Sequence, residues 1–338
     1  MIEKRIKNDL NLKRWRIFKS HKLAMVSSWL ILLGTFFSFT APFWANSRPI
    51  IMSYKSSLYF PIIRDYHPDD FDIKDQMTVD YRQLSASGGA WAIWPLIKWN
   101  PFESNKAVDS YPGAPSGQNL MGTDDRGRDV LTRLLYGFKY SIIYAVSVWL
   151  ITFIVGTIIG GCMGYFGGKW DFYGQRFIEI FSSVPQFFLL LIIIAIFQPN
   201  LMWLVGISSL FGWIAISYYI RGEFLKNRKM EYVEAARSLG ASTPSLIFKH
   251  ILPNSLAPII TFTPFVIAGN IMGLASLDYL GFGLSPPTPS WGELLSQAQK
   301  YFTIAWWLAV FPSMALFFTL TMLTLIGEAV RDALDPRL

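Results

Sequence analysis

Three aspartates in the segment MGTDDRGRDV lie close enough in sequence to suggest chemistry. Asp124, Asp125 and Asp129 could serve as a general acid and a general base, or could hold a cation through carboxylate oxygens. No histidine, nucleophile or metal-ligand spacing accompanies them in this segment, and catalysis requires such a constellation. We therefore expect a structural role on the outer face, in which Thr123 or Asp124 caps a helix and Asp129 pairs with Arg133.

Other reactive side chains are scarce. Three histidines and one cysteine leave few ligands for a metal or redox site and exclude an internal disulfide: His21, His67, His250 and Cys162. The stretch GYFGGKW, residues 164–170, lacks the glycine spacing of a Walker-type phosphate-binding loop, and no serine or threonine follows its lysine. We therefore expect no enzyme activity, no metal site and no cofactor in this chain.

A charged segment interrupted by glycine and proline, EYVEAARSLGASTPSLIFKHILPN, occupies residues 231–254 between two apolar runs. Its first part is predicted to be a short amphipathic helix, with one apolar face formed by Tyr232, Val233, Ala236 and Leu239. Gly240 follows the last of these residues, where a left-handed helix end needs no side chain. The segment should therefore turn sharply at the glycine.

A second helix is predicted after this glycine elbow. Ser242 or Thr243 is expected to cap it and Pro244 to occupy its first turn. Its apolar residues would be Leu246, Ile247 and Ile251. Because Pro253 has no amide hydrogen, this helix is expected to end before it.

The elements around the elbow are those of a membrane protein. The 338 residues are 52% hydrophobic and only 16% charged, against about 25% in soluble domains. A span needs roughly 20 apolar residues. Six stretches qualify: residues 24–44, 141–165, 177–197, 201–219, 255–280 and 305–326. The net charge of +7 does not indicate nucleic acid, because a basic surface argues for it only in a soluble protein.

The distribution of lysine and arginine sets the expected orientation. Most of them lie in segments that share one side of the membrane if the N terminus is cytoplasmic, and long translocated segments count little. Both termini are therefore expected in the cytoplasm. The predicted organisation is a basic segment at 1–23, which lies along lipid headgroups, a first span at 24–45 that anchors the chain, an outer insertion at 46–120, a core at 121–332 with a cytoplasmic loop at 221–254, and a tail at 333–338.

Several residues inside the spans are candidates for packing or for a transport pathway. A four-residue repeat along the second span should form a stripe where another helix approaches closely: Gly156, Gly160, Gly164 and Gly168. Pro185 interrupts the third span and is predicted to kink it, with a gate as the alternative. Asn270 is expected to form an interhelical hydrogen bond, with substrate contact as the alternative, and Asp278 is a further pathway candidate.

The elbow resembles the EAA loop, the signature of permease subunits of bacterial ABC importers. The matching residues are Glu234, Ala235, Ala236, Gly240, Leu252 and Pro253. His250 stands where the family has isoleucine, and Ile251 beside it is expected to face the same groove. The resemblance implies that the elbow is a coupling helix that docks into a cleft on a separate ATPase, as a helix in a groove.

Further motifs resemble the oligopeptide and dipeptide branch of these permeases. They are MGTDDRGRDVLTRLLYGFKYS at 121–141 and LDYLGFGLSPPTPSWGELL at 277–295, and the match covers about 120–332. Relatives carry an acidic residue at the place of Leu274. The aromatic-rich insertion resembles that of Yej-type permeases, which import microcin C and longer peptides. We expect its aromatic residues to pack with one another rather than to touch a delivered peptide.

The resemblance implies an all-α polytopic protein with six transmembrane helices, a type I importer permease (MetI-like) core and a long periplasmic insertion. It also implies a location in the bacterial inner membrane and three kinds of partner besides the bilayer: a second permease subunit in a heterodimer, ATPase subunits that bind ATP and Mg, and a periplasmic peptide-binding protein. The expected function is ATP-driven import of peptides or peptide-like compounds. The alternatives are an ion-coupled secondary transporter, which needs buried ionisable groups, and an intramembrane enzyme, which needs a nucleophile and base.

Overall fold

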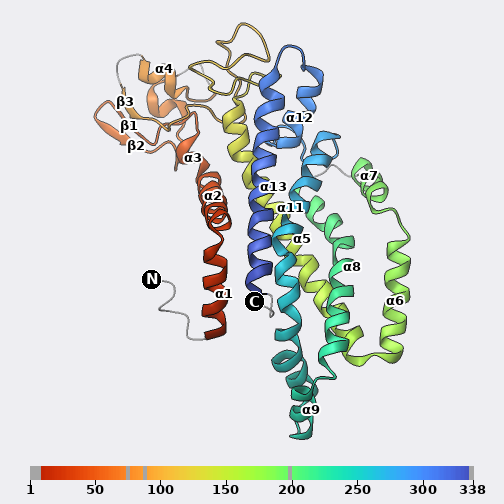
Figure 1. The fold of residues 1–338 in the computed structure, drawn as a ribbon. Helices are drawn as coiled ribbons and strands as arrows, with labels where there is room; N and C mark the ends of the chain where they lie inside the picture. The colour runs from red at the N-terminus through yellow and green to blue at the C-terminus, as the bar shows by residue number, and fades with distance from the viewer. Residues whose placement is uncertain (1–8, 74–76, 87–89, 197–199, 335–338) are drawn as a thin grey trace.

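The computed structural model describes residues 9–73, 77–86, 90–196 and 200–334. Long helices run between a lobe at one end and the short helix α9 at the other (Figure 1). Five helices of the described residues are long and apolar enough to cross a membrane: α2 (Lys22–Phe39), α5 (Val130–Phe166), α8 (Leu201–Asn227), α11 (Leu252–Tyr279) and α13 (Trp306–Leu334). The predicted mostly helical membrane fold is therefore confirmed, whereas the count of six spans is not.

The predicted third span, residues 177–197, is two shorter helices. They are α6 (Gly168–Ser182) and α7 (Gln186–Ile196), and Pro185 lies in the break between them. Proline cannot donate a helical hydrogen bond and its ring crowds the preceding turn, so the chain starts a new helix there instead of continuing with a kink. Of the predicted turn at 198–200, the first two residues lie outside the described residues, and Asn200 caps α8 by accepting from the Trp203 amide at 2.9 Å.

The helix core forms where α5, α8, α11 and α13 meet (Figure 1). One cluster of buried apolar side chains joins α5, α11 and α13 with α12 (Trp291–Lys300), and includes Trp291 and Leu308. A second cluster joins α5 and α8 to α7 and α11. These contacts fix the directions of the helices from which the candidate site is built.

The N-terminal helices lie against α13. The helix α1 (Asp9–Ser20) precedes α2 with only His21 between them, and a short helix, α3 (Ala41–Trp44), follows α2. His21 lies 3.6 Å from Asp332, so the junction of α1 and α2 lies beside the last turns of α13. The first eight residues of the predicted basic segment, and residues 335–338 of the predicted tail, lie outside the described residues.

The insertion after the first span contains a small antiparallel sheet that was not predicted. The strands β1 (Ile51–Tyr54), β2 (Ser57–Tyr59) and β3 (Ala90–Ile93) pair in the order β2-β1-β3, with Met52 opposite both Tyr59 and Ala92. A 3-10 helix, η2 (Pro68–Phe71), and α4 (Tyr81–Ala86) cover one face of the sheet.

The aromatic side chains of the insertion fill its core. Phe71 is 2% exposed and its ring packs against those of four tyrosines: Tyr54, Tyr59, Tyr66 and Tyr81. Aromatic pairs of this kind contribute to stability beyond the area they bury. The expectation that the aromatic residues of the insertion pack together is therefore confirmed for these five, whereas Trp91 and Phe102 are 59% and 49% exposed.

The elbow between α8 and α11 departs from its prediction at Pro253. The segment consists of α9 (Glu231–Ser238), α10 (Thr243–Ser245) and a π-helical turn, η3 (Leu246–Ile251), which runs directly into α11. The predicted end before Pro253 is wrong, because this proline lies in the first turn of α11, where no helical amide is needed. The wider hydrogen bonding of the π turn lets the chain pass the proline.

Candidate functional site

The glycine elbow closes as the spacing predicts. Gly240 has a φ of +82°, the left-handed conformation that glycine adopts without strain. The Ala241 amide donates to the Ala236 carbonyl at 3.0 Å and the Gly240 amide to the Arg237 carbonyl at 3.0 Å, which is the Schellman arrangement. Ser242 precedes α10 as predicted, although its side chain makes no capping hydrogen bond.

The elbow is anchored to the end of α8 by apolar side chains. Val233 of α9, with Leu246 and Ile251 of η3, is buried against Ile220 and Phe224 of α8. Ile251 is 0% exposed, so the expectation that it faces a partner's groove is wrong. Burying an aliphatic side chain of this size contributes about 1.5–3 kcal/mol, so the elbow is held in place before any partner binds.

The opposite face of the elbow is open. Leu239 is 88% exposed and Phe248 is 66% exposed, and Ala235 is exposed beside them. Leu239 was predicted to share an apolar helical face with Val233, but it lies past the last turn of α9 and, unlike Val233, is exposed. Glu234 pairs with Arg237 at 2.7 Å on this open face.

Leu252 and Pro253 complete the predicted elbow residues. Leu252 is partly buried against the same cluster, and Pro253 is exposed. One residue further on, the Asn254 side chain donates to the Tyr232 hydroxyl at 3.2 Å, which ties α9 to the start of α11. The predicted residues therefore come together around one helical turn at the end of the molecule.

The glycine stripe packs against α8. A Cβ atom built on Gly160 would lie 2.3 Å from the Ser217 carbonyl oxygen, and one on Gly164 would lie 2.7 Å from that of Arg221. Gly156 meets Trp213 and Ile216 in the same way. Gly168 does not belong to the stripe, because α5 ends at Phe166 and no atom lies within 4 Å of a Cβ built there.

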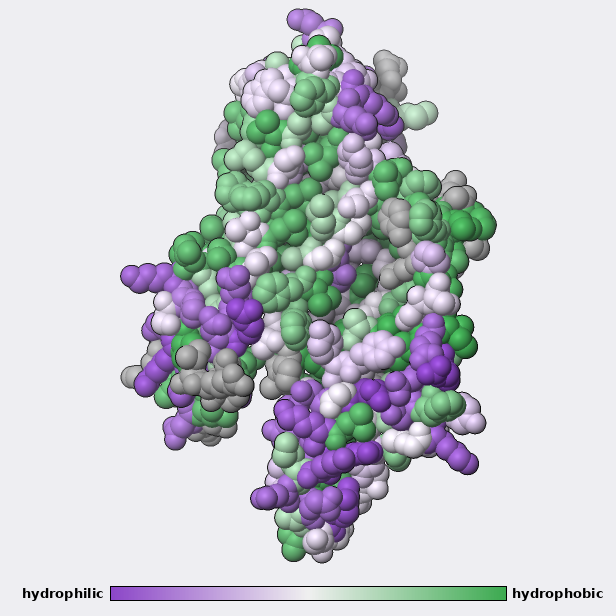
Figure 2. Space-filling model, turned by 45° about the vertical axis from the view of Figure 1, so that its right-hand side comes forward, coloured by the Kyte–Doolittle hydropathy of each residue, from purple (hydrophilic) through white to green (hydrophobic). Residues whose placement is uncertain are grey.

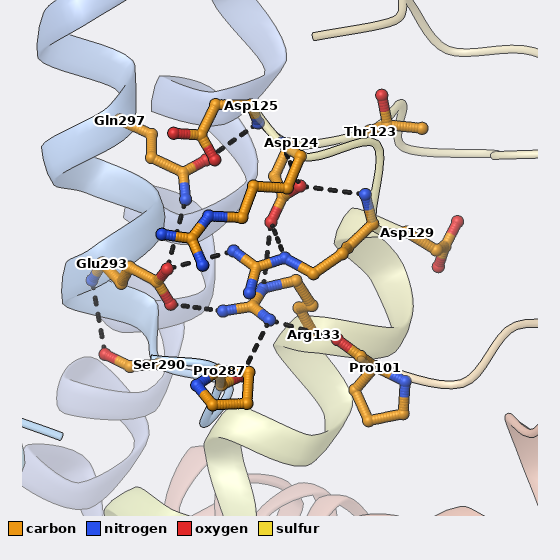
Figure 3. Close-up of polar contacts among 12 residues, drawn as sticks. Pro101, Thr123, Asp124, Asp125, Asp129, Arg133, Pro287, Ser290, Glu293 and Gln297 are labelled. Carbon is orange, nitrogen blue, oxygen red and sulfur yellow. Dashed lines mark hydrogen bonds and ion pairs between the residues drawn. The ribbon is translucent and has the colours of Figure 1, made fainter. Parts of the chain in front are cut away.

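A buried ion cluster lies at the other end of the molecule (Figure 3). Arg128 donates to Asp124 at 2.6 Å and to Glu293 of α12 at 3.0 Å. Arg133 of α5 lies between the same two carboxylates, 3.3 Å from that of Asp124, and donates to Glu293. Both arginines and Asp124 are at most 2% exposed. Pairing with opposite charges is the form in which proteins tolerate buried ions, and here the Nε atom of Arg133 contributes to the ion pair without forming a hydrogen bond to any described residue.

The three aspartates of the opening motif thus differ in their contacts: Asp124 and Asp129 make structural contacts, whereas the Oδ1 atom of Asp125 makes no hydrogen bond within the described part of the chain. Asp129, not Thr123 or Asp124, caps α5 by accepting from the Thr132 amide at 2.7 Å. The predicted pair of Asp129 with Arg133 is wrong, because the Asp129 carboxylate is occupied by that amide and by Asn119. Burial raises the pKa of Asp129, and burial followed by the neighbouring Asp124 charge raises the pKa of Asp125.

Glu293 is the residue that sequence reasoning missed. Ser290 caps α12 by accepting from the Glu293 amide at 3.3 Å, so Ser290-Trp-Gly-Glu293 has the spacing of a capping box. That spacing marks a helix start. It does not reveal that the glutamate side chain reaches back to α5.

The remaining pathway candidates have partners within the chain. Asn270 donates from its side chain to the Ala145 carbonyl of α5 at 3.1 Å, so the interhelical hydrogen bond is confirmed. Asp278 accepts from the Leu284 amide at 2.6 Å and from the Ser290 hydroxyl, which ties the end of α11 to the start of α12. Pro185 is exposed in the break between α6 and α7.

Comparison with known proteins gives the same assignment as these motifs. Residues 153–338 match the family described as binding-protein-dependent transport system inner membrane component. Residues 13–76 match the N-terminal transmembrane domain of oligopeptide transport permease C. The two matches together cover the first span, part of the insertion and most of the core.

Curated relatives match over most of their length. The chain is 38% identical over 334 residues to the inner membrane ABC transporter permease protein YejE of Escherichia coli, covering 97% of this chain and 98% of the relative. It is 38% identical over 358 residues to the peptidoglycan transport system permease protein YejE of Agrobacterium fabrum, covering 96% and 92%. It is 33% identical over 239 residues to the oligopeptide transport system permease protein OppC of Haemophilus influenzae, covering 71% and 75%.

Fold, motifs and relatives agree. The family is one of non-catalytic membrane components. The chain therefore belongs to the inner-membrane permeases of binding-protein-dependent ABC transporters.

Proposed function

We propose that this chain is the C-type permease subunit of an ATP-driven importer for peptides or peptide-like compounds, including microcin C-like ones. Its elbow, residues 231–254, would couple it to a separate ATPase. The observation that carries the proposal is the two-sided elbow: Val233 and Ile251 are buried against α8, while Ala235 and Leu239 are left open at the end of the molecule (Figure 1). A helix that is fixed to its own chain on one face and exposed on the other is suited to bind in a groove of a partner protein.

The proposed assembly contains three kinds of protein partner. A second permease subunit forms a heterodimer with this chain. ATPase subunits, which themselves bind ATP and Mg, dock on the elbow, and a peptide-binding protein meets the opposite end. The termini and the elbow lie in the cytoplasm. Relatives named for oligopeptide, glutathione and peptidoglycan transport support a peptide-containing substrate.

A cross-linking experiment tests the coupling role. Cys162 is changed to serine, and a single cysteine is placed at Ser238, which is exposed on α9. In membranes that contain the intact complex, this cysteine should cross-link to an ATPase subunit, with a yield that changes when ATP is added. A cysteine at Ser110, exposed at the opposite end, is the matched control and should give no such link. Equal yields from the two positions would contradict the proposal.

A further inference from the structure

An apolar cavity lies between the end of α5 and the start of α6. Its volume is about 540 Å³, within the range of small-molecule sites. Its lining comprises Ile158, Cys162, Lys169, Trp170, Tyr173 and Phe177, among others. Lys169 is the one charged residue of the lining, so the cavity combines an apolar body with a cationic rim.

The turn between the two helices shapes this cavity. Gly167 and Gly168 have φ values of +65° and +51°, which let the chain reverse directly after α5. A Cβ atom on Gly174 of α6 would lie 2.5 Å from the sulfur of Met163, so the two helices cross closely at that point. The cavity is open to the surroundings, because Ile158, Trp170 and Phe177 of its lining are all exposed.

The charges around the turn leave a net positive rim. Asp171 is neutralised by Arg221, whose guanidinium donates to it at 2.5 and 2.8 Å. No carboxylate of the described residues lies within ion-pair distance of Lys169. Arg228 donates to the Tyr165 carbonyl at 2.8 Å and adds a second cation behind the turn. Lys169 also lies in the first turn of α6, where the helix dipole favours an anion.

The aromatic residues place the rim at the depth of lipid headgroups. Trp170 is 68% exposed and Tyr173 is 67% exposed, and tryptophan and tyrosine are enriched at the boundary between hydrocarbon and water. Figure 2, turned to bring the α6 side forward, shows hydrophobic residues over the middle of the molecule and hydrophilic residues gathered towards the end that carries α9. Ile158 and Phe177 therefore line the part of the cavity that faces the hydrocarbon.

We infer that this cavity binds an anionic phospholipid, with an acyl chain along Ile158 and Phe177 and the headgroup phosphate at Lys169. Basic pockets between membrane helices on the cytoplasmic side are suited to anionic headgroups, and each lysine near the surface contributes about fivefold to such binding. A helix of the second permease subunit is the competing occupant. It would leave the isolated lysine without a counter-charge unless it also brought an acidic residue.

Photo-cross-linking in the complete transporter tests this site. The complex is reconstituted in nanodiscs that contain phosphatidylglycerol or phosphatidylcholine with a diazirine on the acyl chain, and adducts are mapped by mass spectrometry. The yield of adducts on residues 158–177, divided by the yield on α2, should be higher with phosphatidylglycerol than with phosphatidylcholine. Lys169→Gln should reduce this preference about fivefold, whereas Lys229→Gln, which removes an exposed lysine at the same end, should not change it.

A second variant keeps the test decisive if Lys169→Gln prevents assembly. Ile158→Trp should fill the cavity and reduce adducts of both lipids on 158–177. Equal labelling by the two lipids in the unaltered complex would overturn the inference. Lipid labelling of residues 158–177 in the isolated chain but not in the assembled complex would also overturn the inference, because a partner helix would then cover the cavity.

Discussion

At the scale of single residues, the absence of a side chain at Gly160 determines how closely α5 and α8 approach. The nearest atoms to a Cβ built there belong to the backbone of α8, which cannot move aside as a flexible side chain could. Van der Waals packing is a main source of helix association in lipid. Gly156, Gly160 and Gly164 therefore form a line of close contact between α5 and α8, which we call the glycine seam.

Gly160→Ala should lower the stability of the purified chain in detergent by about 1–3 kcal/mol, because the added methyl group overpacks the seam. Gly206→Ala on α8 is the control, since a Cβ atom there meets no atom within 4 Å. Thermal unfolding of both variants measures the difference. Equal melting temperatures would mean that the seam adapts and that the close approach is not required.

Glu293 supplies the carboxylate that two buried arginines share. Glu293→Gln should lower the free energy of unfolding by about 3 kcal/mol, because Arg128 and Arg133 would remain buried with Asp124 as their one shared counter-charge. Glu179→Gln breaks an exposed pair with Arg176 and should cost at most about 1 kcal/mol. Chemical unfolding of the two variants compares the buried pair with the exposed one. A small effect at Glu293 would show that water reaches the cluster.

At the scale of elements, the elbow depends on one backbone conformation. Gly240→Ala should strain the left-handed residue by about 1 kcal/mol and loosen the end of α9. If the elbow docks on the ATPase as proposed, the apparent affinity for that subunit should fall about fivefold. Gly222→Ala, in α8 with no atom near its Cβ, should leave the affinity unchanged. Titration of ATPase onto the immobilised permease measures both.

The elements that could be predicted from sequence are those with a strong physical requirement. The helices α2, α5, α8, α11 and α13 were all found, because a span must be long and apolar. The helix end at Gly240 was found because few residues accept its conformation. Strands of three or four residues, such as β2, carry too short a pattern to be recognised.

Other features depend on contacts between distant residues. Arg133 was assigned to Asp129 four residues earlier, but Glu293 and Asp124 hold it instead. The burial of Ile251 likewise depends on where α8 ends, which the local pattern does not state. The passage of the chain through Pro253 was missed because a π turn has no clear sequence signal.

At the scale of the whole molecule, the insertion and the elbow lie at opposite ends of the long helices (Figure 1). The orientation we propose puts the insertion in the periplasm and the elbow in the cytoplasm. In a Cys162→Ser background, a membrane-impermeant maleimide applied to spheroplasts should label a cysteine at Ser110, and should label one at Ser238 only after the membrane is opened. The reverse pattern would invert the topology and contradict cytoplasmic termini.

The ion cluster has a consequence for how the chain is made. Glu293 lies 160 residues after Arg133 in the sequence, so the ribosome delivers it long after α5 has entered the membrane. Until then the two arginines have Asp124 as their paired carboxylate, and the N-terminal end of α5 has no α12 to pack against. In a nascent chain that stops before α12, Arg128 and Arg133 therefore share the carboxylate of Asp124 without that of Glu293, so the cluster is complete only after α12 has been made.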